Sequence, residues 1–357
     1  MVPSPASKFK QEKSLSPFHR ILFKAIAGVC MLAATTVTAS DLPDTEESIA
    51  AQRKYNASVI DVLVADGTPR ALVLAATAMS YGGETSRAGV DGQRELLLGR
   101  AVQMAPDDAL VQWLAAVYAL PANTLSEPAT ALQRIEPDNG AVWLFQLAAA
   151  SRAKDSTGVT EALARIGASR RFDNHYVDYS LAWLAMSPES TLPEPNAHND
   201  EQGTAPLPLF MAIARAAALV LPNYVIPIQA CKSVDQPLAT DRREACIAAG
   251  RLMLNESSTL ISMRIGAALL RLAGAEDADE INRNTEYFVQ EYTLLSSTAL
   301  EDPEEIARFQ ADWLQTHNEL TVAKNMLARA GIPILPPANW ESDSKSTMAR
   351  IARPKDG

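Results

Sequence analysis

The residues best suited to metal chemistry lie in and just after the polar, aromatic stretch 170–176. Asp173, His175 and Asp178 carry the oxygen and nitrogen ligands that zinc accepts. On a continuous helix only His175 and Asp178 share a face, because they are three residues apart. Two ligands do not make a metal site, so we expect none. We expect Asp173 to cap a helix and the neighbouring tyrosines to pack in the core.

Motifs for nucleophilic or phosphate chemistry are sparse. Beyond the amino-terminal leader the chain has three histidines, at positions 175, 198 and 317, and no Gly-x-Ser-x-Gly or His-Glu-x-x-His pattern. Four closely spaced glycines do not form a phosphate-binding loop and predict a loop between helices at Gly82, Gly83, Gly89 and Gly92. We therefore expect a protein that is not an enzyme and that uses no cofactor.

One acidic residue needs a separate comparison. Glu256 and Ser257 resemble the Glu-Ser pair that holds the catalytic acid of soluble lytic transglycosylases, which also have helical superstructures. That family continues with an aromatic residue and a Gly-Ala-x-Gly-Leu-Met-Gln run, whereas this chain continues with Ser-Thr-Leu-Ile. We therefore interpret 255–258 as a helix boundary and not as a catalytic site.

The segment 1–39 is typical of a secretory signal peptide. Residues 1–24 carry five basic side chains and one acidic one, and residues 25–40 are uncharged. Small residues near the end of this stretch predict cleavage after Ala39. The alternative is an uncleaved signal anchor formed by 21–39. The sequence thus predicts a periplasmic or secreted protein, with an inner-membrane anchored protein as the alternative.

Two cysteines, Cys231 and Cys246, remain once the leader is removed. In an oxidising compartment they can form a disulfide, and closing a loop of about 15 residues would stabilise the fold by roughly 3 kcal/mol. The alternative is two buried thiols on separate helices, since free cysteine behaves as a small hydrophobic residue. The pair is therefore a disulfide candidate.

Composition indicates the fold class and excludes one class of partner. Alanine and leucine dominate, whereas aromatic residues make up only 6% of the chain. This balance favours close helix packing over a β-sandwich and predicts an all-α protein. The formal net charge is −10, and basic residues cluster only in the leader. We therefore expect no nucleic acid partner.

Two Pro-Asp-polar steps lie 31 residues apart in the first half of the chain, at Pro106-Asp107-Asp108 and Pro137-Asp138-Asn139. Each is predicted to end one helix and begin the next. The pattern resembles the tetratricopeptide repeat, because Ala101 lies five residues before one proline and Trp143 six residues after the other. It departs from that family in its period and at Leu132 and Gln112, which replace a small residue and an aromatic. The resemblance implies a superhelical α-α array over 40–187 with a partner-binding surface.

A proline-rich linker at 188–208 is predicted to separate this array from a C-terminal helical domain at 209–332. Apolar residues alternately four and three apart run through 281–299 and 306–330, which indicates two seams of heptad type. They predict an antiparallel hairpin of long helices, roughly 40 Å in length. We expect it to pack internally, with homodimerisation as the alternative. Residues 333–357 are predicted to be a flexible tail, loose or strapped along the surface.

These features predict an exported, non-catalytic helical-repeat scaffold that binds a protein or peptide partner and is a monomer. Two alternatives stay open. One is a cell-envelope hydrolase whose site has no recognisable motif, and the other is a membrane-anchored assembly factor that keeps its N-terminal helix.

Overall fold

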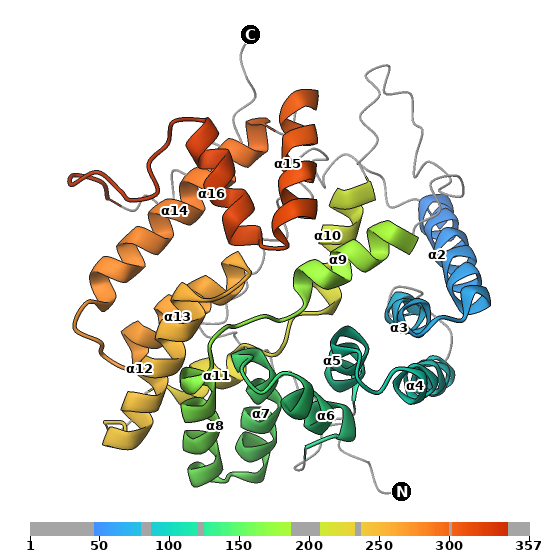
Figure 1. Cartoon of the computed structure of the whole chain (residues 1–357), viewed down its shortest axis with the longest axis horizontal. Coiled ribbons are helices and arrows are strands. Elements are labelled where there is room, and N and C mark those ends of the chain that lie inside the picture. Colours follow the sequence, from blue (N-terminus) through green and yellow to red (C-terminus); the bar gives the residue numbers. More distant parts are fainter. Residues whose placement is uncertain are drawn as a thin grey trace, which may run out of the picture.

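The computed structural model describes residues 46–79, 87–119, 125–186, 208–232, 237–299 and 302–341. Within these ranges the secondary structure is α-helical, with short 3-10 turns and two isolated β-bridges but no strand, so the predicted all-α class is confirmed (Figure 1). None of the helices in these ranges is long and apolar enough to cross a membrane. The predicted signal peptide, nearly all of the predicted linker and the end of the predicted tail lie outside the described residues.

The first half of the chain forms short helices separated by tight caps. In chain order these are α2 (Glu46–Asp66), α3 (Pro69–Ala78), α4 (Arg87–Met104), α5 (Ala109–Tyr118), α6 (Glu127–Ile135), the 3-10 turn η3 (Gly140–Val142), α7 (Trp143–Ala153), α8 (Ser156–Ala168) and α9 (Tyr176–Met186). The two Pro-Asp-polar steps separate helices as predicted. Asp108 accepts hydrogen bonds from the first backbone amides of α5, and Asn139 accepts one from Ala141 in η3.

The glycine-rich stretch before α5 differs from the prediction. We expected Gly89 and Gly92 to lie in a loop, but α4 begins at Arg87 and passes through both. A glycine inside a helix costs only about 1 kcal/mol relative to alanine. Burial of Leu97, Leu98 and the alanine that follows them on the inner face of α4 offsets that cost. The expected loop at these two glycines is therefore wrong, and Gly82 and Gly83 lie outside the described residues.

The second half contains α10 (Pro208–Leu219), α11 (Val225–Ala230), α12 (Thr240–Asn255), α13 (Leu260–Leu272), α14 (Ala278–Ala299), α15 (Pro303–Thr316) and α16 (Glu319–Arg329). The predicted hairpin of two long helices is wrong, because the segment predicted as its second helix forms two separate helices, α15 and α16. His317 adopts a left-handed conformation with φ of 51° and ends α15, and Asn318 caps α16 through the backbone amide of Thr321. Seam residues on both sides of the break, Trp313 and Leu320 among them, are buried. The chain turns at the break, so α15 packs on α16, and α14 packs on α13 and α16.

Helices from the two halves pack directly on each other. Helix α8 lies against α12, and α9 lies against α10 and also contacts α3. Figure 1 shows α9 and α10 between the N-terminal helices α3 and α5 and the C-terminal helix α15. Buried apolar residues from both halves form one continuous cluster. The division of the chain into one domain at 40–187 and another at 209–332 stays a prediction.

A disulfide joins Cys231, directly after α11, to Cys246 on α12. Their Cα atoms are 5.7 Å apart, and both residues are fully buried. Of the two alternatives that the sequence left open, the structure therefore contains the bonded pair. The bond attaches the short helix α11 to the long helix α12.

Residues 333–341, the described part of the tail, lie along α14. The Arg283 guanidinium donates hydrogen bonds to backbone carbonyls of this segment. The ring of Trp340 packs edge-on against Tyr287, with 5.4 Å between ring centroids. This part of the tail is therefore strapped along the surface, which is one of the two arrangements we predicted.

Candidate functional site

Three loops meet at the centre of the molecule, after α6, α8 and α12. Two isolated parallel bridges join them: Asn139 pairs with Arg171, and Phe172 pairs with Ser257. The approach is close at Gly140, where a Cβ atom would lie 2.5 Å from the side chain of Leu252. Glycine at this position therefore lets the loop after α6 pack against α12.

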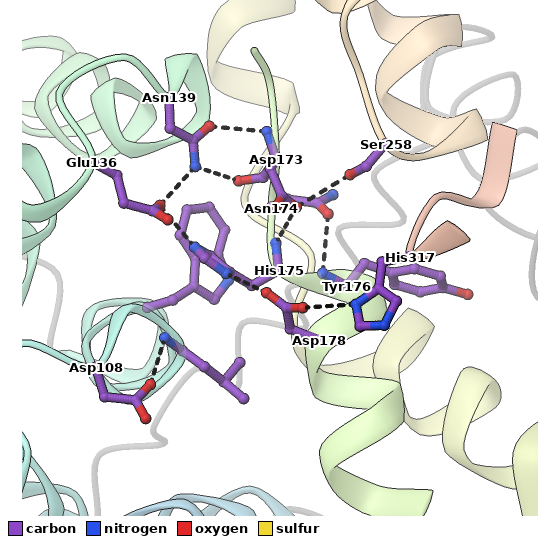
Figure 2. Close-up of polar contacts among 12 residues, drawn as sticks. Asp108, Glu136, Asn139, Asp173, Asn174, His175, Tyr176, Asp178, Ser258 and His317 are labelled. Carbon is purple, nitrogen blue, oxygen red and sulfur yellow. Dashed lines mark hydrogen bonds and ion pairs between the residues drawn. The ribbon is translucent and has the colours of Figure 1, made fainter. Parts of the chain in front are cut away.

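His175 lies at the meeting point of these loops and is 2% exposed (Figure 2). It precedes α9, with φ of 56° in the left-handed region. Its Nδ1 atom is 3.1 Å from Oδ2 of Asp178, and its Nε2 atom is 3.0 Å from Oε2 of Glu136. The imidazole ring therefore bridges two carboxylates that lie 42 positions apart in the sequence.

The charges of this cluster stabilise one another. Burial opposes the charged form of His175, but hydrogen bonds to Asp178 and Glu136 and the charges of Asp173 and Glu136 outweigh it and raise the histidine pKa to about 10. Burial likewise disfavours ionised Glu136, yet the hydrogen bond and charge of His175, with help from its other donors, lower the pKa of Glu136 to about 2. At neutral pH, without a bound ligand, the group is an imidazolium between carboxylates.

Glu136 is held in place by two further donors. Arg171 donates to Oε1 at 2.8 Å, and the side-chain amide of Asn139 donates to Oε2 at 2.9 Å. Glu136 directly follows α6 and precedes the second Pro-Asp-polar step. Its position before this step is the only feature of the sequence that marks Glu136. Sequence patterns alone therefore do not identify Glu136 as a partner of His175.

We predicted that Asp173 caps a helix, but the next helix, α9, starts three residues later, at Tyr176, so this prediction is wrong. The Oδ1 atom of Asp173 accepts hydrogen bonds from the backbone amide of His175 at 3.0 Å and from the hydroxyl of Ser258 at 3.2 Å. Its backbone amide and carbonyl both pair with the side chain of Asn139. The prediction that the tyrosines pack in the core is confirmed, since Tyr176 and Tyr179 are buried.

The non-helical turn brings three possible metal ligands together. One ligand atom from each of Asp173, His175 and Asp178 lies within 4.8 Å of the others. The reason we gave for expecting no site, that a continuous helix separates these side chains, therefore does not hold. His317 adds a second imidazole, with Nδ1 4.0 Å from Oδ1 of Asp178 (Figure 2). His198 lies outside the described residues.

The Glu-Ser pair is separate from this cluster chemically. Helix α12 ends at Asn255, so the predicted helix boundary is confirmed. Glu256 is exposed, and its backbone carbonyl accepts a hydrogen bond from the amide of Phe172. The hydroxyl of Ser257 donates to the carbonyl of Thr259 at 3.3 Å. In the structure the backbone of this pair connects the loop after α12 to the loop after α8, through Phe172.

A second surface feature lies on the outer face of α4. Leu96 is 75% exposed, and Met104, two turns further along the helix, is 49% exposed. Gly92 and Gly99 lie one turn either side of Leu96, and a Cβ atom added at either would meet nothing within 4 Å. This face therefore presents an apolar side chain flanked by bare backbone.

Comparisons with known proteins add no relative. No family model matches the chain, and neither a curated protein nor a solved structure is significantly similar to it.

Proposed function

We propose that this protein is an exported, non-catalytic α-helical scaffold that binds a protein or peptide partner through the outer face of α4. The observation that carries this proposal is Leu96, a leucine three-quarters exposed between two glycines on a helix. A large apolar side chain in water is unfavourable by about 2 kcal/mol relative to a buried one. A partner that covers Leu96 recovers this free energy, and the glycines allow its backbone to come close.

The shape of this surface favours an amphipathic helix or an extended apolar peptide as partner. Gly92, Leu96, Gly99 and Gln103 recur at intervals of four and three residues, so they form one stripe along α4. A partner helix recognises such a stripe with side chains at its own matching intervals. We further propose that α4, which packs on α3 and α5, belongs to a superhelical, repeat-like array over 40–187.

Export is supported by the disulfide between Cys231 and Cys246. Structural disulfides persist in oxidising compartments such as the periplasm or the extracellular space, and they are rare in the cytosol. The predicted signal peptide at 1–39 supplies the route. Measurement of the intact mass of the exported protein tests this: a mass lacking 1–39 agrees with export by a cleaved signal, whereas an uncleaved chain indicates the membrane-anchored alternative.

Partner binding can be tested with a matched pair of leucine substitutions. Leu96→Glu places a charge on the proposed face, and Leu314→Glu places the same charge on α15, where Leu314 is 46% exposed. Each protein is immobilised and incubated with native envelope extract, and the retained proteins are identified by mass spectrometry. We expect a partner retained by the wild type and by Leu314→Glu, and reduced at least tenfold with Leu96→Glu. Equal retention by all three proteins, or no retained partner, contradicts the proposal.

A further inference from the structure

We propose that Asp173, His175 and Asp178 bind a divalent transition-metal ion of the zinc class. One ligand atom from each residue lies within 4.8 Å of the other two. Zinc binds imidazole nitrogen and carboxylate oxygen at about 2.0 to 2.2 Å in a tetrahedral arrangement, so neighbouring ligand atoms around the ion are roughly 3.4 Å apart. The most widely separated ligand atoms therefore need to approach one another by about 1 to 1.5 Å to close around an ion, which side-chain rotation of the two aspartates can supply.

The environment of His175 matches that of a metal-binding histidine. A ligating histidine commonly donates its second ring N–H to a carboxylate, which fixes the ring and selects the nitrogen that binds the metal. Here Nε2 pairs with Glu136 at 3.0 Å, and Glu136 is itself fixed by Arg171. This arrangement leaves Nδ1 on the side of Asp178, at 3.1 Å from its carboxylate. Glu136 is thus a supporting group and Nδ1 the proposed ligand atom.

An ion can reach this site from solvent. The side chain of His175 is buried, whereas those of Asp173 and Asp178 are 29% and 43% exposed. The histidine therefore forms the floor of the site and the aspartates its rim. His317, on the exposed side of Asp178, is placed to supply a fourth ligand after rotation of its side chain, and otherwise water completes the coordination (Figure 2).

The ligand set selects the class of ion. One imidazole nitrogen with two carboxylates suits Zn²⁺ and related transition metals, whereas Ca²⁺ and Mg²⁺ prefer all-oxygen sites. Binding replaces the proton on Nδ1 of His175 with the metal ion and releases that proton to solvent, while Nε2 keeps its proton and its hydrogen bond to Glu136. The metal ion thus replaces the hydrogen bond between Nδ1 of His175 and the carboxylate of Asp178.

Zinc binding by purified, EDTA-treated and dialysed exported protein tests the site directly. Equilibrium dialysis against Zn²⁺ alone should give one ion per chain for the wild type. Asp178→Asn removes a charged ligand while keeping the volume of the side chain, and should weaken binding at least tenfold. Asp138→Asn is the matched control, because Asp138 is on a neighbouring loop and its carboxylate pairs only distantly with Arg170, at 3.7 Å.

Thermal unfolding separates loss of the site from loss of the fold. A ligand that binds only the folded state raises the melting temperature, so Zn²⁺ should raise the melting temperatures of the wild type and Asp138→Asn. For Asp178→Asn a cooperative transition should remain while the shift is lost. Asp173→Asn provides a second variant with the same expected result. Absence of stoichiometric zinc in the wild type, or equal zinc affinity in Asp178→Asn and the wild type, overturns the proposal.

Discussion

At the scale of single residues, two buried ionisable groups are held in opposite charge states, His175 charged and Glu319 neutral. His175 is stabilised in its charged form by carboxylates on either side. Glu319, the first residue of α16, is equally buried, and its carboxylate accepts a hydrogen bond from the backbone amide of Leu260 at 2.8 Å. Burial raises the pKa of Glu319 to about 7, although that hydrogen bond lowers it. A buried charge is thus stable in this protein where a partner of opposite charge is present.

Replacement of Glu319 by glutamine tests this assignment. The folded pKa of about 7 lies above the ordinary value of 4.5, so the stabilisation from protonated Glu319 is fully present below pH 4.5 and is lost as the pH rises through 7. A shift of this size corresponds to roughly 3 kcal/mol. Glu319→Gln keeps an acceptor for Leu260 and cannot ionise. We therefore expect the stability of the variant relative to wild type to increase between pH 4.5 and pH 7.

Urea unfolding at several pH values measures this difference, with the exposed Glu304→Gln as a control that should follow the wild type. Parallel curves for Glu319→Gln and wild type would show that burial does not raise the pKa of Glu319.

At the scale of helices, close packing around α12 depends on glycines. A Cβ atom at Gly266 on α13 would lie 2.6 Å from the backbone nitrogen of Leu254 and 2.7 Å from the carbonyl of Gly250, both on α12. On the opposite side, a Cβ atom at Gly167 on α8 would lie 2.5 Å from the side chain of Ala248. Helix α12 therefore joins α8 to α13 through contacts that leave no room for a methyl group.

An alanine at Gly266 should therefore destabilise the protein, because backbone atoms of α12 and α13 must move apart. We expect a loss of about 1 to 3 kcal/mol in the free energy of unfolding, the usual range for an overpacked core. Gly99→Ala on α4 is the matched control, since its methyl group meets open space. It should stabilise the protein by about 0.5 to 1 kcal/mol through helix propensity. Urea unfolding of both variants tests the prediction, and equal effects of the two substitutions would contradict it.

At the scale of the whole molecule, contacts between segments far apart in the sequence hold the described residues together. Helices α9 and α10 pack on each other across the predicted linker, and the indole N–H of Trp113 on α5 donates to the carbonyl of Val220, directly after α10. The disulfide adds a covalent tie within the second half. A change in the second half should therefore alter unfolding of the first.

Removal of the disulfide by Cys231→Ala with Cys246→Ala should lower the free energy of unfolding by about 3 kcal/mol, because the unfolded chain gains the entropy of an open loop of about 15 residues. Chemical unfolding of the double variant measures the loss. In wild-type mature protein, thiol labelling under denaturing, non-reducing conditions should find no free cysteine. Two labelled thiols in that sample would rule out the bond.

Features that depend on neighbouring residues could be predicted from the sequence. Thr68 with Pro69, Asp108, and Asp302 with Pro303 begin helices as their local hydrogen-bonding groups require. The all-α class follows from composition, and the disulfide was one of two arrangements that the cysteine spacing allowed. The prediction of a long hairpin was wrong because two local patterns conflict. The heptad pattern continues through 306–330, whereas Asn318 favours the start of a new helix. In the structure a new helix, α16, starts after Asn318.

Only the tertiary structure could assemble the cluster around His175. Its partner Glu136 lies 39 positions earlier in the chain, and no local pattern pairs them. The left-handed turn at His175, which overrides helix geometry and brings Asp173 to the same site, is held by contacts from the loops after α6 and α12. Helix starts are decided by hydrogen bonds within a few residues and can be predicted from sequence, whereas this site is decided by packing between distant segments.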